Sequence, residues 1–111
     1  MRTVGLALLA LSAAMPASAY ADTADFAFLV QQRVTAMECP GYPADPIAIN
    51  DAIMAEGKRL GWSRQETIRE MEGRRLHQVA RHKSNPSGYC RQATDMEAAN
   101  KHRLRNLGVR P

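Results

Sequence analysis

The sequence has few aromatic residues and few cysteines, and neither type is grouped into a recognisable cofactor site. Aromatic residues make up 5% of the 111 residues, and the only cysteines are Cys39 and Cys90. Because no Cys-x-x-Cys pair occurs, neither haem attachment nor thioredoxin-like exchange is expected. The sequence also lacks a glycine-rich phosphate loop, a nucleophile turn and the zinc-protease signature. We therefore expect no enzyme activity, no cofactor and no metal site.

The first 21 residues have the pattern of a signal peptide. A positive charge at Arg2 is followed by an apolar stretch over positions 4–14 and then by Pro16. Signal peptidase requires small side chains one and three residues before the cut, a condition that Ala21 and Ala19 both satisfy. We favour cleavage after Ala21, with cleavage after Ala19 as the alternative.

Cleavage after Ala21 leaves residues 22–111 as a single helical domain. A membrane anchor is the rival interpretation of residues 1–21, but their apolar stretch is shorter than the about 20 residues that span a bilayer. We therefore expect a protein that is located in the periplasm or secreted. No transmembrane segment is expected after cleavage of the signal peptide.

Export would place the two cysteines in an oxidising compartment, where a disulfide is the default. A mature domain of this size buries only a modest core, so a covalent link would support it. The alternative is a pair of free or metal-binding thiols, but neither cysteine has a second cysteine or histidine at ligand spacing. We therefore expect a disulfide between Cys39 and Cys90.

Basic residues are concentrated in the second half of the sequence. Residues 22–57 contain one basic and six acidic residues, whereas residues 58–111 contain 13 basic and five acidic residues. This distribution fits an anionic partner such as phospholipid, lipopolysaccharide or an acidic protein. The alternative is a solvated surface whose charge attracts the acidic half of the same chain. Aromatic residues are not interleaved with the basic ones, so nucleic acid is not expected as a partner.

Apolar spacing predicts helices and no strand. The first helix covers about residues 23–38 and is ended by the two prolines and the glycine within positions 39–43. The second begins at Asp45, a good N-cap that is followed by a proline, and it stops at Gly61. Gly57 lies within this helix, where it is either a weak point or the site of a close helix contact.

The third helix is predicted to open with a capping box formed by Ser63 and Glu66. It ends by positions 84–86, and a single fourth helix is expected to begin near Pro86 or Ser87 and to run to about Leu107. The buried stripe of the third helix is expected to consist of Ile68, Met71, Leu76 and Val79.

Together these elements predict an all-α fold, a small four-helix bundle. The disulfide would join the end of the first helix to the first turn of the last. Five arginines of the third helix mostly lie off the expected buried stripe, and we predict that they form a binding face together with an apolar groove between helices. These residues are Arg64, Arg69, Arg74, Arg75 and Arg81.

The other polar and sulfur-containing side chains have simpler interpretations. A metal site built from His77, His82 and His102 would require the third and fourth helices to meet there, so surface positions are favoured. The carboxylates of Glu66, Glu70 and Glu72 are expected to cap or to form ion pairs rather than to act as acid and base. Tyr42 and Tyr89 are expected to cover the disulfide, with a small binding surface as the alternative. Core packing is expected of four widely spaced methionines, Met37, Met54, Met71 and Met96.

Three segments of the chain resemble a family of small secreted alphaproteobacterial proteins of unknown function. They are the Leu-Gly-Trp-Ser segment at positions 60–63 followed by Glu66, the arginine-bearing helix that comes next, and the Asn-Pro…Tyr-Cys segment at positions 85–90. The resemblance covers about residues 30–107. It implies an exported helical domain, and it supplies no activity and no site residues.

In mature size, helical content and the spacing of its two cysteines, the chain is also similar to periplasmic acid-stress chaperones of the HdeA type. This architectural likeness implies a stress-related binding role. We expect a non-enzymatic periplasmic binding or accessory protein, stress-related if the likeness extends to function. An inhibitor or immunity-type protein of a periplasmic enzyme is the first alternative, and a small hydrolase is the second. The partner and the oligomeric state are left open by the sequence.

Overall fold

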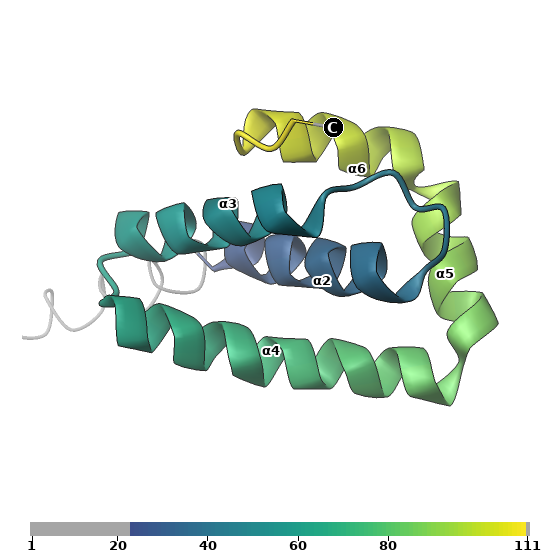
Figure 1. Ribbon diagram of the computed structural model, residues 1–111, viewed down its shortest axis with the longest axis horizontal. Coiled ribbons are helices and arrows are strands. Elements are labelled where there is room, and N and C mark those ends of the chain that lie inside the picture. The colour runs from purple at the N-terminus through teal and green to yellow at the C-terminus, as the bar shows by residue number, and fades with distance from the viewer. Residues whose placement is uncertain (1–22, 111) are drawn as a thin grey trace, which may run out of the picture.

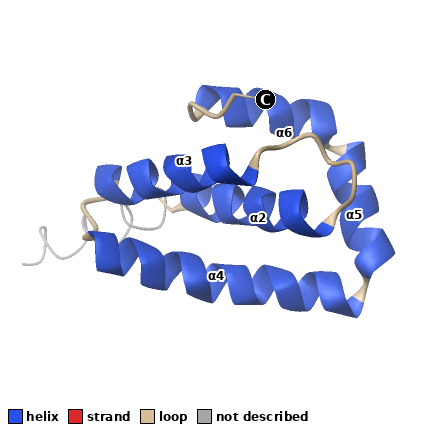
Figure 2. Ribbon diagram, in the orientation of Figure 1, coloured by secondary structure: helices blue, strands red, loops and turns tan. Residues whose placement is uncertain are grey.

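A computed structural model describes residues 23–110, which form five helices (Figure 1). No strand occurs within these residues (Figure 2). None of the helices in this part of the chain is long and apolar enough to cross a membrane. The predicted signal peptide lies outside the described residues. The helices are α2 (Ala24–Glu38), α3 (Pro46–Arg59), α4 (Arg64–Ser84), α5 (Pro86–Asp95) and α6 (Glu97–Asn106).

The three longest helices lie side by side, with α2 and α4 running in one direction and α3 in the other (Figure 1). α5 crosses the end of the molecule where α2 ends and α4 arrives. α6 then turns back over α2 and α3, where Leu104 and Val109 join the core. The all-α prediction is confirmed, and the acidic first half of the chain lies against its basic second half.

The prediction of a single, uninterrupted fourth helix is wrong. The helix is interrupted at Met96, which has φ −99° and ψ 8° and separates α5 from α6. Thr94 and Asp95 are poor helix formers directly before the break, and the Thr94 hydroxyl donates to the Cys90 carbonyl oxygen at 3.0 Å. The break allows α5 to cross the end of the bundle and α6 to return along it, so the described residues contain five helices rather than four.

Local signals start α3 and α4 as predicted. The Asp45 side chain accepts a hydrogen bond from the backbone N–H of Ile47 at 2.9 Å. At the start of α4 the capping box is complete: Ser63 Oγ accepts from the Glu66 N–H at 3.1 Å, and the Glu66 carboxylate accepts from the Ser63 N–H at 2.9 Å. Because these side chains satisfy N–H groups that have no intrahelical partner, both helix starts are fixed locally.

A glycine turn folds α4 closely back onto α3. Gly61 has φ 81°, and the N–H of Trp62 donates to the Gly57 carbonyl oxygen at 2.9 Å, as in a Schellman motif. Thr67 is the only buried residue of α4, and it packs directly on Gly57. A Cβ atom at position 57 would lie 2.1 Å from Thr67 Oγ1. Gly57 is therefore the site of a close helix contact.

The core is built around α2. Phe26 is fully buried, and its ring meets the edge of the Trp62 ring with centroids 4.9 Å apart. Helices α2, α3 and α6 contribute buried apolar side chains to this cluster, and α4 adds the half-buried Met71. The fully or nearly fully buried members are Phe26, Phe28, Leu29, Val30, Ile49, Ile53, Leu104 and Val109.

The predicted disulfide is present. Cys39 directly follows α2, and it is bonded to Cys90 of α5 with a Cα–Cα distance of 5.5 Å. Val34, Tyr89 and Cys39 form a second buried cluster at this end of the molecule, and Tyr42 packs against it. The two tyrosines therefore gather around the bridge, as the sequence suggested.

Burial is smaller than expected on α4 and among the methionines. Of the predicted stripe of α4, Ile68 is 41% exposed and Leu76 is 56% exposed. Met37 is 60% and Met96 50% exposed, so the prediction of core packing is wrong for these two methionines. On α4 the physical reason is that its neighbours α2, α3 and α5 leave one flank without a covering helix, so the apolar residues of that flank stay exposed.

Candidate binding surface

The five arginines of the predicted binding face are spread around α4. At 3.6 residues per turn, Arg64 and Arg75 lie on one side of the helix, and Arg74 and Arg81 lie on another. Arg69 points away from both pairs. The structure therefore brings these residues together in pairs and does not form a single basic face from all five.

Two of the arginines pack on aromatic rings. The Arg74 guanidinium lies over the Phe26 ring, 5.6 Å from its centroid, and that of Arg81 lies over the Tyr89 ring at 5.7 Å. Arg74 is also 3.8 Å from the Glu70 carboxylate. A cation above an aromatic face is attracted by the ring quadrupole, so these two side chains help to hold α4 against α2 and α5.

Arg75 forms a two-point ion pair with Glu72. The hydrogen bond from Arg75 lowers the pKa of the Glu72 carboxyl, and the same contact raises the pKa of Arg75. By contrast, Arg64 and Arg69 are exposed, and neither forms an ion pair with a residue of the described part of the chain. These two arginines are therefore available to an anionic group from outside.

A hollow of about 300 Å³ lies between α2 and α4, and we call it the α2–α4 groove. Leu76 follows Glu72 by four positions and precedes Val79 by three, so it lies on the same side of α4 as both of these lining residues. The exposed Ile68 continues this row one turn before Glu72. The lining includes Arg33, Val34 and Met37 from α2, and Glu72, Arg75 and Val79 from α4.

The groove has an apolar floor and charged edges. Val34 is buried, and the exposed Met37 stands beside it. Arg33 forms no ion pair within residues 23–110, and its Nε is shielded from solvent without a hydrogen-bond acceptor there. At the disulfide end, Glu38 Oε2 lies 3.9 Å from Nδ1 of His82. This combination of exposed methionine, leucine and isoleucine with basic side chains suits a protein partner.

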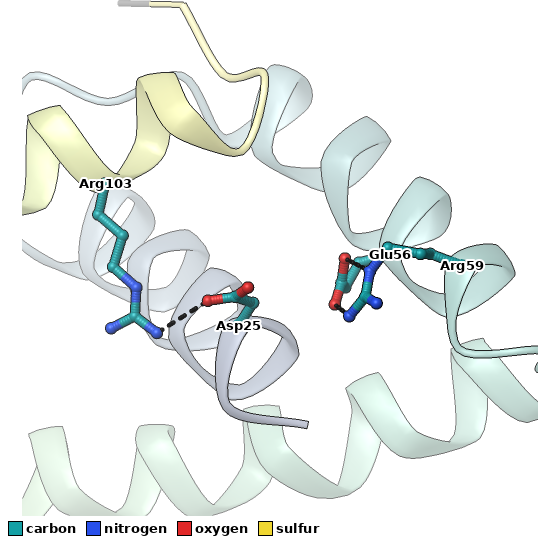
Figure 3. A network of polar contacts seen from close by, with 4 residues as sticks. All are labelled: Asp25, Glu56, Arg59 and Arg103. Carbon is teal, nitrogen blue, oxygen red and sulfur yellow. Dashed lines mark hydrogen bonds and ion pairs between the residues drawn. The ribbon is translucent and has the colours of Figure 1, made fainter. Parts of the chain in front are cut away.

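A second hollow of about 220 Å³ lies between α2, α5 and α6, and we call it the polar cavity. Its wall contains side-chain amides from three helices, namely Gln32, Gln92 and Asn100, and the guanidinium of Arg103. Figure 3 shows Arg103 extending from α6 to Asp25 on α2, with Nη2 donating to Oδ1 at 3.0 Å. The nearby Glu56 and Arg59 of α3 form a separate pair at 2.5 Å in the same view.

The two tyrosines at the disulfide support this cavity through their hydroxyl groups. The Tyr42 hydroxyl donates to Gln32 Oε1 at 2.6 Å and accepts from Asn100 Nδ2 at 3.1 Å. The Tyr89 hydroxyl donates to Gln78 Oε1 at 3.0 Å. Burial raises the pKa of both phenols above the ordinary value of 10.0. Tyr42 and Tyr89 therefore cover the bridge and also position polar groups.

The histidines and carboxylates that the sequence singled out are separated in space. No group of three His, Cys, Asp or Glu side chains is placed to hold a metal ion among the residues that the structure describes. The ring of His82 meets the edge of Tyr89, with centroids 5.5 Å apart, whereas His102 contacts Asn106 on α6. The backbone N–H of Ser63 lowers the pKa of Glu66, which is engaged in the capping box.

No protein-family model matches the chain, and comparisons with curated proteins and with solved structures find no similar protein. The resemblances inferred from the sequence therefore stay predictions. Sequence reasoning missed the exposed Met37 and Leu76 because helical spacing marks a stripe as apolar without showing whether another helix covers it. It also missed Gln32, Asn100 and Arg103, because their spacing forms no motif.

Proposed function

We propose that this protein is a non-enzymatic binding or accessory protein of the periplasm, or a secreted one, that docks a partner protein in the α2–α4 groove. One observation carries this proposal: α4 is 21 residues long, yet it buries only Thr67. A helix that serves only to complete a bundle normally buries a continuous stripe. Here the flank of α4 beside the groove keeps Leu76 and Ile68 exposed, and Met37 of the groove lining is exposed as well.

The charge of α4 defines the chemistry of the partner. This helix contains six Lys or Arg residues and three Glu residues. Glu70 and Glu72 already face Arg74 and Arg75, so the uncompensated positive charge includes the exposed Arg64 and Arg69. The occupant that fits is an amphipathic helix with apolar side chains for the groove and acidic residues on its flanks. Opposite charges at the edges would mainly raise the association rate and make binding sensitive to salt.

The proposed compartment has two supports. Residues 1–21 have the charge, apolar stretch and small residues of a cleavable leader. The Cys39–Cys90 disulfide suits an oxidising environment. Intact-mass measurement of the protein from its host, before and after reduction and alkylation, tests both points. We expect a chain that begins at Asp22 and has no free thiol; a retained leader, or two thiols alkylated without reduction, would contradict export.

The docking proposal is tested by crosslinked capture of the tagged mature protein from its own periplasm, at neutral and at acid pH. We compare the wild type with Leu76→Glu, which replaces an exposed apolar side chain on the groove side of α4 with a charged one. The control is His77→Glu, which introduces the same charge on an exposed neighbour about 100° further around α4, on the side away from Glu72 and Val79. A partner that uses the groove should be lost with Leu76→Glu and retained with His77→Glu.

The number of partners distinguishes the forms that this function could take. One stoichiometric partner at neutral pH supports an accessory role, and loss of that partner's own activity on binding would identify an inhibitor or immunity-type protein. Many partners captured only at acid pH would support a stress-related role. Equal capture by both variants, or no protein captured at either pH, would overturn docking in the groove.

A further inference from the structure

The charge that lines the polar cavity between α2, α5 and α6 is positive only. Arg103 is the only residue of its lining that carries a charge at neutral pH, and no carboxylate belongs to the lining. The nearest acidic partner of Arg103 is Asp25, which contacts the guanidinium through a single nitrogen. The cavity therefore favours a neutral or anionic guest over a cation.

The cavity wall offers hydrogen-bond donors to a guest. Gln32 is only 2% exposed, and its oxygen is occupied by the Tyr42 hydroxyl, so its NH₂ group remains as a donor. That NH₂ group, like the side-chain amides of Gln31 and Gln92, makes no hydrogen bond to another residue within 23–110. The Gln32 nitrogen is not among the buried atoms that lack a partner, so this donor is open to solvent, and a guest with acceptor oxygens could replace the water that it binds.

Arg103 is held in a fixed orientation. Its guanidinium lies over the Phe28 ring, 4.2 Å from the centroid, and its Nη2 is anchored on Asp25. A guanidinium presents five N–H donors in a planar fork that matches a carboxylate, and only one of its nitrogens is engaged here. Because these two contacts already orient the side chain, a guest would have less of it to immobilise on binding.

The cavity also has a small apolar part and a limited size. Phe28, Ala93 and Met96 contribute to its wall, so a short carbon chain could be accommodated. A volume of about 220 Å³ lies below that of pockets for drug-sized ligands, which start at roughly 300 Å³. We propose that this cavity binds a small carboxylate of about amino-acid size, with its oxygens on Arg103 and the Gln32 amide. The proposal is independent of docking in the α2–α4 groove.

The test is a titration of the oxidised mature protein, followed by amide NMR shifts at constant ionic strength. The probes are acetate, succinate and glutamate, and succinamide serves as the uncharged counterpart of succinate. We expect at least one carboxylate to give saturable shifts at residues of α2, α5 and α6 around the cavity, whereas succinamide should give none. Constant ionic strength separates this binding from general attraction to a basic protein.

Three variants distinguish a ligand site from a merely structural contact. Arg103→Gln should weaken binding about tenfold or more, since it removes a charged donor. Arg105→Gln removes the same charge from an exposed neighbour outside the cavity and should leave binding unchanged. Asp25→Asn releases the guanidinium from its internal partner and should strengthen binding. If Arg103 served only to tie α6 to α2, Arg103→Gln and Asp25→Asn would act in the same direction.

Several results would overturn the proposal. Absence of saturable shifts with all three carboxylates at millimolar concentration would do so, as would equal shifts with succinamide. Equal loss of binding in Arg103→Gln and Arg105→Gln would show that only net charge matters.

Discussion

Gly57 and Gly73 both lie within helices, and they differ in what surrounds them. Gly57 of α3 faces Thr67 of α4 so closely that any side chain would collide with it. Gly73 of α4 has open space where a Cβ atom would be placed. Glycine is therefore required for packing at position 57, whereas at position 73 it only lowers the helix propensity of α4.

This difference predicts opposite effects of one substitution. Gly57→Ala should lower the free energy of unfolding by about 1–3 kcal/mol, because α3 and α4 must move apart. Gly73→Ala should raise it by about 0.5–1 kcal/mol, because alanine reduces the entropy of the unfolded chain and favours helix. Urea unfolding of the two variants under oxidising conditions measures both effects. Tolerance of Gly57→Ala would contradict the close contact with Thr67, and destabilisation by Gly73→Ala would contradict the open space at that position.

The buried phenols predict a loss of stability at alkaline pH. Burial raises the pKa of Tyr42 and Tyr89, so both stay protonated in the folded protein above the pH at which an unfolded tyrosine ionises. Above about pH 10 the unfolded state therefore binds fewer protons than the folded state, and stability falls as pH rises through the folded pKa values. Alkaline titration followed by tyrosinate absorbance, with Tyr42→Phe and Tyr89→Phe to assign the signals, checks this. Ionisation of both at the ordinary pKa would contradict it.

At the scale of helices, local sequence signals predicted where a helix starts and stops better than they predicted whether it continues without a break. Asp45, Ser63 and Gly61 act within a few residues, so the bounds of α3 and α4 could be read from the sequence. The break at Met96 could not, because Thr94 and Asp95 are only a weak local signal, and the break also depends on α5 reaching Cys39 while α6 returns to the core. Helical spacing likewise placed Leu76 on an apolar stripe, but the covering of that stripe is a property of the assembled bundle.

The capping box of α4 gives a prediction at this scale. Ser63→Ala should destabilise the protein by about 1 kcal/mol, since the N–H of Glu66 loses its acceptor. The Ser63 N–H lowers the pKa of Glu66, so the contribution of this carboxylate is present above the ordinary pKa and is lost as pH falls through the folded value. Thermal unfolding at neutral and acid pH measures both effects. Ser87→Ala, in the first turn of α5 and without a capping role, is the matched control; an equal loss there would argue against the box.

At the scale of the whole molecule, few ion pairs within residues 23–110 connect the acidic and basic halves of the chain. Asp25 reaches Arg103, Glu56 pairs with Arg59 three positions later, and Glu38 lies near His82, whereas the pairs of Glu70 and Glu72 stay within α4. Folding therefore leaves much of the positive charge of α4 on the surface. The sequence showed this asymmetry of charge, but it could not show which arginines would be used internally on Phe26 and Tyr89.

The disulfide spans a sequence separation of 51 residues and should contribute strongly to global stability. In the loop-entropy model, a bridge that closes a loop of this length is worth roughly 4 kcal/mol. The Cys39→Ser/Cys90→Ser double variant should therefore unfold at a markedly lower denaturant concentration than the oxidised wild type. The reduced wild type serves as the control, and it should resemble the variant. If both variant and reduced protein kept the stability of the oxidised form, the bridge would have no role in holding α5 to α2.

The same bond makes the chain a closed ring from Cys39 to Cys90, with α3 and α4 inside it and all of α2 and α6 outside. A protease that cuts once within this ring, for example in the turn at Gly61, would produce two polypeptides that stay covalently joined. Under non-reducing conditions, such a nicked molecule would migrate as one species. Its two pieces would separate only on reduction, whereas a cut after Cys90 would release a free C-terminal fragment at once.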